Sequence, residues 1–454
     1  MIRYLKSLII QNIVSPVGLA MVSYSIFLFA WLFPSGLYTD YIHEPDLMFL
    51  DPLSFVFYTS CVAAFLLGVR ASRYTGVPTR KTPVARIVVR SPLRYLGLPI
   101  FLGLVLCSIY LIMIGGKLDF IGLLISQQGG SIKAAGQFGQ LGAGRWSAGL
   151  FMLTAALWWS AFRANQLNLR GGSKLIFRML FFLGVVVDLV TCVATVDRTN
   201  LMTLIAGSSV VYLYGKTYST NVRILKLLFI GLSSAVGVVA AFLFISFLRG
   251  ALAVRELVML LLGYTIVSYN RMAALLLGVL HDSYEGRGAY LFPILRENQT
   301  LNNIFHFNER FDWPSAYSLW AAAFTSVGSA GLNAGFNFYS VFGALYSDLG
   351  WFILAYLFVI GLLVGYMWIH FRAGKAFAIV LYPWCAFCVL FWTGFNVMFD
   401  ARVLDLIKMA LLLSIYDKLT IRQTQDTLDM RAYVDPGGAF LEPVTSGSSA
   451  AFLK

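Results

Sequence analysis

Uncharged apolar runs of about 20 residues recur along the whole chain, and they constrain its fold more than any other feature of the sequence. A helix needs about 20 apolar residues to cross the core of a bilayer. Only 12% of the residues are charged and the mean hydropathy is +0.76, so too few polar side chains are present to cover aqueous domains. The sequence therefore predicts an all-α, polytopic membrane protein.

The apolar runs predict about ten membrane spans, at 15–33, 52–69, 95–114, 146–162, 180–196, 200–214, 227–247, 341–369, 377–395 and 403–416. The first run has no small-residue cleavage site, so we expect a retained span rather than a signal peptide. Two more apolar stretches, 257–267 and 272–280, are each too short to span. We expect them to be interfacial or re-entrant helices, whereas a crossing helix pair would raise the total to about 12 spans.

Basic residues gather on one side of this arrangement. If the N-terminus is cytoplasmic, the inner segments carry basic residues and no acidic residue, and the loop at 70–94 is the most basic of them. This bias predicts that both termini are cytoplasmic, with 1–416 as a single transmembrane domain and 417–454 as a cytoplasmic tail. It also explains the net charge of +13 without a nucleic-acid partner.

Two segments on the opposite, outer side are long. The segment at 248–340 is too long for a structureless loop and should be a large folded periplasmic loop with the two interfacial helices. The segment at 115–145 is rich in Gly and Gln and suits either a glycan contact or a plain solvated connector.

Three arginines stand where apolar runs end on the outer side: Arg198, Arg249 and Arg402. Basic residues are disfavoured on this side, and guanidinium groups bind phosphate oxygens in pairs, so we expect an anion at the outer interface. The alternative is local pairing, of Arg198 with Asp197 and of Arg402 with Asp400.

Ionisable residues within the spans are few. Asp188 lies in the middle of a predicted span, and we expect it to pair with Lys408, while Asp405 is an alternative partner for that lysine. The five cysteines fall in apolar runs, so no disulfide framework is predicted. The sequence contains no nucleotide-binding loop and no metal-ligand spacing. We therefore expect a substrate that is already activated on another carrier, such as a lipid phosphate.

The segment at 335–351, GFNFYSVFGALYSDLGW, resembles the "N-x-Y-[ST]... Y-x-D-[FL]-G" segment of bacterial oligosaccharide repeat-unit polymerases, the Wzy-like O-antigen and exopolysaccharide polymerases. Two other features are similar to that family: an arginine after a short outer turn, Arg198, and an Arg-Gly pair before the large outer loop, at Arg249.

The resemblance implies a GT-C-like inner-membrane glycosyltransferase that works at the periplasmic face. It would transfer a growing glycan from polyprenyl pyrophosphate to another lipid-linked repeat unit and release the carrier, with Arg198 and Arg249 on the pyrophosphate and with no cofactor. Its partners would be the lipid-linked donor and acceptor, membrane lipid, a chain-length regulator and a flippase. Guanidinium groups held in place can stabilise the departing pyrophosphate without a metal ion.

The remaining candidate residues have roles that follow from this chemistry. The attacking hydroxyl needs a proton acceptor, for which His306 is our first choice and Glu309, Asp282 and His281 are alternatives. Asn337, Tyr339 and Asp348 would position sugar hydroxyls or brace the loop, and an alternative role for Asp348 is a favourable interaction with a helix dipole. The other proposed substrate contacts are Arg402, Asp197, Arg255, Arg271 and Asp282.

Two other functions fit the same layout. An O-antigen ligase would move finished polymer from the same carrier to a lipid core, and the sequence barely separates it from a polymerase. A lipid-linked oligosaccharide flippase would need charges along a central cavity, whereas the charges within the predicted spans here reduce to Asp188, Asp405 and Lys408.

Overall fold

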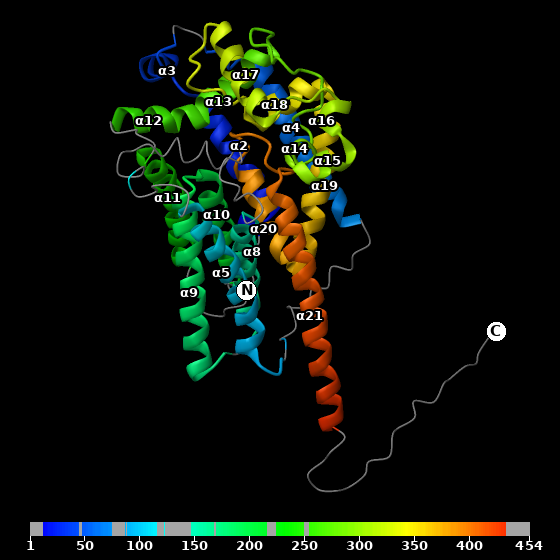
Figure 1. Ribbon diagram of the computed structural model, residues 1–454. Helices are drawn as coiled ribbons and strands as arrows, with labels where there is room; N and C mark the ends of the chain where they lie inside the picture. Colours follow the sequence, from blue (N-terminus) through cyan, green and yellow to red (C-terminus); the bar gives the residue numbers. More distant parts are fainter. Residues whose placement is uncertain are drawn as a thin grey trace, which may run out of the picture.

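Figure 1 shows the computed structural model, in which every described element is a helix. The structure describes residues 12–44, 48–74, 87, 89–115, 122, 147–167, 169–215, 224–248 and 254–432. Its longer helices are α2 (Pro16–Trp31), α3 (Ser35–Ile42), α4 (Pro52–Ala71), α5 (Pro92–Gly115), α8 (Ala148–Ala164), α9 (Gly171–Ala194), α10 (Arg198–Gly215), α11 (Ile224–Leu248), α19 (Ile353–Arg372), α20 (Ala376–Leu390) and α21 (Arg402–Ala432). The shorter ones are α12 (Val254–Leu262), α13 (Ser268–Leu276), α14 (Pro293–Glu297), α15 (Gln299–Phe305), α16 (Phe307–Arg310), α17 (Ala316–Ser329) and α18 (Ser340–Leu349).

Most predicted spans coincide with one helix, whereas the run at 341–369 is divided into α18, a 3-10 turn at Gly350–Phe352 and α19. Six helical stretches of the described chain are long and apolar enough to cross a bilayer, and one of them, Arg255–Leu276, is not among the ten predicted spans. A seventh is added if α2 and α3, which meet at 90°, form one broken span. The prediction of 10 to 12 spans is therefore supported only for six or seven helices of the described chain. The other predicted spans form helices that are shorter or less apolar, such as α20 with 15 residues.

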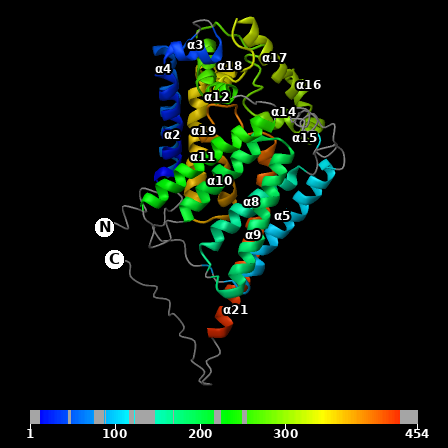
Figure 2. The same ribbon diagram turned by 90° about the vertical axis from the view of Figure 1, so that its left-hand side faces the viewer.

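The shorter elements gather at one end of the molecule. Figures 1 and 2 show α3, α17 and α18 at the top, whereas the free ends of α9 and α21 point to the bottom. We call the end that carries α3 and α12 to α18 the upper face. It is built largely from residues 254–340, which form a series of short helices, whereas the periplasmic location of this segment stays a prediction.

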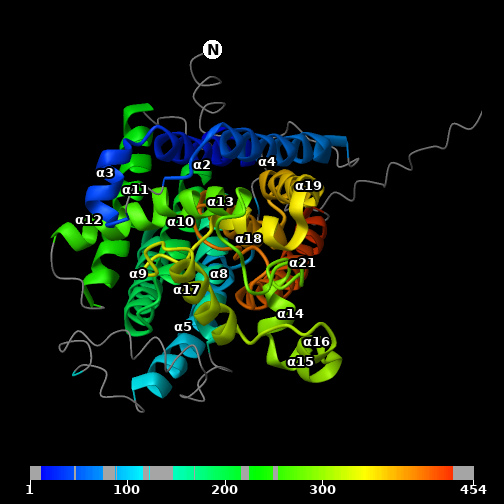
Figure 3. The same cartoon turned by 90° about the horizontal axis from the view of Figure 1, so that it is seen from above.

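The two short apolar stretches of that segment do not form separate helices, which corrects the prediction of a helix pair. α12, a π-helical turn at Gly263–Val267 and α13 follow one another without a break. The combined helix meets the length and hydropathy of a span, but Figures 1 and 3 show α12 running across the upper face. The predicted interfacial position of this helix stays a prediction.

Glycines allow α4 and α19 to pack closely against each other. A Cβ on Gly361 would lie 2.0 Å from the carbonyl oxygen of Phe65, and a Cβ on Gly68 would lie 2.0 Å from that of Phe358. Small residues of this kind let two helix backbones touch within a membrane. Gly361 and Gly365 form a G-x-x-x-G pattern, a signal for this pair that the sequence contains.

Two buried carboxylates correct the predicted charge pairing. Asp188 is fully buried and bonds to Thr154 over 2.7 Å, while Lys408 pairs with Asp405 over 2.9 Å; the predicted pair of Asp188 with Lys408 is therefore wrong. Asp417, predicted to start the tail, forms a buried ion pair with Arg163. The helix α21 continues past it to Ala432, so the bundle extends beyond the predicted boundary at 416.

Candidate functional site at the upper ends of two helices

The predicted outer arginines Arg198 and Arg402 are the first residues of α10 and α21. Arg402 joins the two helix ends, because its Nη1 lies 3.8 Å from the Asp197 carboxylate and 3.3 Å from Asn200 Oδ1. Its Nε also pairs with the carboxylate of Asp400. The predicted local pair of Arg402 with Asp400 is thus confirmed, and Asp197 extends it across the helix ends.

The backbone adds positive potential at the same place. The N-terminus of a helix presents free N–H groups and the positive end of the helix dipole. The carboxylates of Asp197 and Asp400 satisfy some of these free N–H groups, since they accept the backbone N–H groups of Thr199 (2.9 Å) and Arg402 (2.8 Å). Two helix N-termini and two arginines therefore share one small region, which favours an anion.

Burial controls the charge of Asp400, whose side chain is 5% exposed. Removal from water raises the pKa of Asp400 to about 6, while the neighbouring Arg402 acts in the opposite direction. The carboxyl group between α20 and α21 is consequently ionised at neutral pH but titrates in mildly acidic solution. Protonation of Asp400 removes one of the carboxylates paired with Arg402, so the net charge of this pair depends on pH.

Arg198 has no carboxylate partner among the described residues, so its predicted alternative pair with Asp197 is wrong. Its Nη1 donates to the hydroxyl of Tyr264 over 3.1 Å, and its guanidinium lies 4.5 Å from the ring centre of Phe242. Its Nε is buried without a hydrogen-bond partner in the described chain. A guanidinium that no carboxylate neutralises can attract an anion, but the buried Nε itself is not exposed to one.

An aromatic row leads from Arg198 to the motif segment. Tyr264 contacts Phe338 with ring centres 5.0 Å apart, and Phe338 contacts Phe395 at 5.9 Å. The neighbour of Tyr264 is Gly263, where a Cβ would lie 1.9 Å from the ring of Phe336. The glycine thus lets the segment before α18 pack directly on the π-helical turn.

The motif residues beside Phe338 are buried rather than exposed to a substrate. Asn337 is 7% exposed and Tyr339 is 4% exposed, and the hydroxyl of Tyr339 makes no hydrogen bond in the described structure. The predicted direct contact of these two side chains with sugar hydroxyls is therefore not supported by their burial. They lie in the wall of the upper face.

Asp348 braces a loop, one of the two roles predicted for it. Its carboxylate accepts the backbone N–H groups of Gly288 (2.9 Å) and Tyr290 (2.6 Å). The hydroxyl of Tyr290 donates to Asp282 over 2.5 Å, so Asp282 belongs to the same brace. Asp348 lies in the last turn of α18, two residues before the 3-10 turn at Gly350–Phe352 that leads into α19, so the predicted interaction with a helix dipole stays a prediction.

Arg271 is fully buried and cannot reach a substrate, which corrects its predicted role. Its guanidinium pairs with Glu44, with Nη1 3.1 Å from Oε2, and Nη2 lies 3.3 Å from the carbonyl of Asn333. Glu44 in turn accepts the hydroxyl of Tyr38 over 2.5 Å and the N–H of Asn333 over 2.6 Å. This network joins α3, α13 and the segment before α18, and burial raises the pKa of Tyr38 within it.

The other predicted site residues are dispersed. Arg255 is exposed and its Nη2 lies 3.1 Å from the carbonyl of Asp40, so it contacts α3. His306 is exposed at the junction of α15 and α16, where its Nδ1 lies 3.6 Å from Glu309. Arg249 and most of the loop at 115–145 lie outside the described residues. Sequence reasoning missed Phe242, Tyr264 and Glu44, because an aromatic or acidic residue in an apolar region gives no local signal of its partner.

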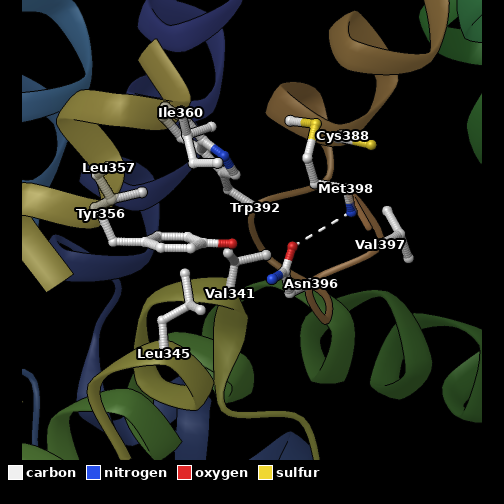
Figure 4. A pocket seen from close by; sticks show the side chains of 10 residues that line it. All are labelled: Val341, Leu345, Tyr356, Leu357, Ile360, Cys388, Trp392, Asn396, Val397 and Met398. Carbon is white, nitrogen blue, oxygen red and sulfur yellow. Dashed lines mark hydrogen bonds between the residues drawn. The ribbon is translucent and has the colours of Figure 1, made fainter. Parts of the chain in front are cut away.

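Figure 4 shows a cavity between α18, α19 and the segment after α20, lined in part by Tyr356, Asn396 and Trp392. Its volume is about 20 Å³, enough for about one water molecule and too small for a sugar ring. Asn396 is held there because its Oδ1 accepts the N–H of Met398 over 3.3 Å. The cavity is therefore not a saccharide site.

Helix content and apolar length define the class of this protein: an α-helical membrane protein whose upper face carries an arginine site. Within the described residues, no group of three His, Cys, Asp or Glu side chains is placed to hold a metal ion. Comparison of the chain with protein-family models, with curated proteins and with solved structures finds no match. The function has to be argued from the site itself.

Proposed function

We propose that the protein is an inner-membrane glycosyltransferase that polymerises oligosaccharide repeat units carried on polyprenyl pyrophosphate. The observation that carries this proposal is the meeting of Arg198, Arg402 and two helix N-termini at the upper face. We propose that this face lies in the periplasm and that both termini are cytoplasmic, since the basic loops lie at the opposite ends of the predicted spans.

The pyrophosphate is the group that this site suits. In the transition state, negative charge develops on the departing pyrophosphate, and guanidinium groups that are already in place stabilise it at little reorganisation cost. Arg198 supplies an unpaired guanidinium, and Arg402 supplies one that is shared with two carboxylates. Arg249 is proposed as a third contact from the family resemblance alone.

The lipid chain of the carrier would lie along α11. One face of α11 is apolar and carries Ala235, Val236, Val239, Ala240 and Leu243. Phe242, on the same helix, lies beneath the guanidinium of Arg198. A polyprenyl tail along this face would thus bring its pyrophosphate close to Arg198.

The proton acceptor that fits this geometry is Asp197 rather than His306. Its side chain is 27% exposed and lies between the starts of α10 and α21, whereas His306 contacts Glu309. We propose that Asp197 takes the proton of the attacking sugar hydroxyl. The residues Asn337, Tyr339 and Asp348 then support the wall behind the site instead of touching sugars.

The experiment is to express variants in the host after deletion of its own gene and to measure polymer and protein abundance. Arg198→Ala is expected to abolish polymer at normal protein abundance, since Arg198 makes few bonds that the fold needs. Arg372→Ala is the control, because it removes an exposed arginine at the opposite end of α10 from Arg198 and should leave polymer unchanged. Normal polymer from Arg198→Ala would contradict the proposal.

Arg402 needs a paired variant, because Arg402→Ala alone leaves the buried Asp400 without its cation and can unfold the protein. The double variant Asp400→Asn/Arg402→Gln keeps two neutral partners in place. It is expected to fold and to lose polymer. Full activity of this folded double variant would remove Arg402 from the site.

A further inference from the structure

Four aromatic side chains, two of them exposed and two partly buried, form a cluster on the upper face, at α15, α16 and the turn that follows. Phe305 and Phe307 have ring centres 5.4 Å apart, Phe307 and Phe311 6.3 Å, and Phe311 and Trp313 5.1 Å. The planes of the last two pairs are inclined by only 14° and 27°. Phe305 is 54% exposed and Phe311 is 48% exposed. We call these four residues the aromatic platform.

Hydrogen bonds, rather than burial of the rings, fix the platform. Trp313 Nε1 donates to the carbonyl of Arg287 over 2.6 Å, and the carboxylate of Asp312 pairs with the guanidinium of Arg287. Below the rings, Asn308 donates its backbone N–H to Asn302 Oδ1 over 2.9 Å and its side-chain amide to the carbonyl of Arg296 over 3.3 Å. The exposed rings are therefore held in position before any ligand arrives, which lowers the entropy cost of binding.

The polar groups around the rings suit a saccharide. A sugar ring has an apolar C–H face, which packs on an aromatic ring, and hydroxyl groups at its edge that need donors and acceptors. Exposed His306 and Glu309 lie within the platform sequence and supply both kinds of group. A helix that inserts at a membrane surface instead carries Lys and Arg on its polar face. Here Glu309 and Asp312 accompany the single Arg310.

The platform is connected to the arginine site through α14. The backbone N–H of Ile294, in α14, donates to the carbonyl of Phe399 over 2.6 Å, in the segment that leads into α21 and Arg402. Asn298 ends α14 and caps α15 by accepting the N–H of Leu301 over 2.9 Å. Figures 1 and 3 show α14, α15 and α16 side by side on the upper face.

We propose that the aromatic platform binds the saccharide chain of the lipid-linked substrate, at sugars beyond the one joined to the pyrophosphate. This rests on the proposed function, since it assigns the sugar part of the same substrate. The platform thereby holds the glycan by ring stacking while the arginines hold the pyrophosphate.

The binding experiment uses the full chain in nanodiscs and, as the probe, the oligosaccharide that mild acid releases from the carrier-linked glycan of the host. Titration calorimetry gives the affinity. Phe305→Ala/Phe311→Ala is expected to weaken binding about tenfold, while Phe305→Tyr/Phe311→Tyr should keep it, because tyrosine retains the ring face. Trp320→Ala is the matched control, since Trp320 is 50% exposed on α17 outside the platform. Equal affinity of the alanine double variant and the wild type overturns the proposal.

A second measurement tests whether the platform lies in lipid instead. Asn303→Cys places a thiol at an exposed position of α15, two residues before Phe305, and the native cysteines are all buried. A polarity-sensitive dye on this thiol is expected to report water and to respond to the added oligosaccharide. Emission typical of lipid, with no response to the oligosaccharide, would make the platform a membrane anchor and overturn the saccharide site.

The two proposals fail in different ways. If the platform variants bind and polymerise normally while Arg198→Ala makes no polymer, the saccharide platform is wrong and the arginine site stands. If Arg198→Ala also makes normal polymer, the proposed function is wrong as well. Shorter chains from the alanine double variant, with normal protein abundance, support both.

Discussion

The protonation state of Asp400 determines whether its carboxylate competes with a ligand for the guanidinium of Arg402. Its pKa of about 6 lies above the ordinary value of 3.8 because the group is buried. The folded state therefore takes up a proton that the unfolded state does not hold between about pH 4 and pH 6. This group contributes most to stability below about pH 4, and that contribution is lost as the pH rises through 6.

The same titration predicts a pH dependence of anion binding. At pH 5, Asp400 is mostly neutral and Arg402 loses a competing partner, so sulfate, which does not titrate in this range, should bind roughly threefold or more tightly than at pH 7.5. Titration calorimetry at both pH values measures this. In Asp400→Asn the difference should disappear, and an equal pH effect in that variant would assign it to another group.

The pair of Arg271 and Glu44 is expected to be structural. Glu44→Ala leaves a fully buried guanidinium without its carboxylate and should lower the free energy of unfolding by about 3–5 kcal/mol. Glu44→Ala/Arg271→Met removes both charges and should recover part of that loss. Thermal unfolding in detergent measures both. A double variant that is no more stable than Glu44→Ala would argue against a charge-based cost.

At the scale of helices, the close packing of α4 and α19 makes a prediction that does not depend on function. Gly361→Ala places a Cβ 2.0 Å from a backbone oxygen of Phe65, so the helices must separate, at a cost of about 1–3 kcal/mol. Gly231→Ala is the control, because no atom lies within 4 Å of a Cβ built there. Comparable melting temperatures of the two variants would show that the helix pair is looser than described.

The helices themselves could be predicted from the sequence, because apolar runs and their lengths follow from the bilayer alone. The number of helices that span the membrane could not be predicted, since only six or seven of the described helices have the length and hydropathy of a span. The continuous helix from α12 to α13 was also missed. Its polar middle, with Asn270 and Arg271, resembles a break, but these side chains are buried against partners far away in sequence.

The candidate site was predictable only in part, and for the same reason. Arg198 and Arg402 stand out because they occur at the ends of apolar runs, on the side where basic residues are rare. Their surroundings depend on contacts over long sequence separations, such as Arg198 with Tyr264 and Arg402 with Asn200. No local pattern distinguishes Arg271, which is buried in an ion pair, from Arg255, which is exposed.

At the scale of the whole molecule, we propose that the chain joins repeat units at the outer surface of the membrane. This is tested by deleting the gene in its host and resolving surface polysaccharide and carrier-linked glycan by size on a gel. We expect the surface ladder to collapse to a single repeat unit. Long chains left on the carrier would indicate a ligase, single units trapped on the cytoplasmic side would indicate a flippase, and an unchanged pattern in both pools would contradict a role in this glycan.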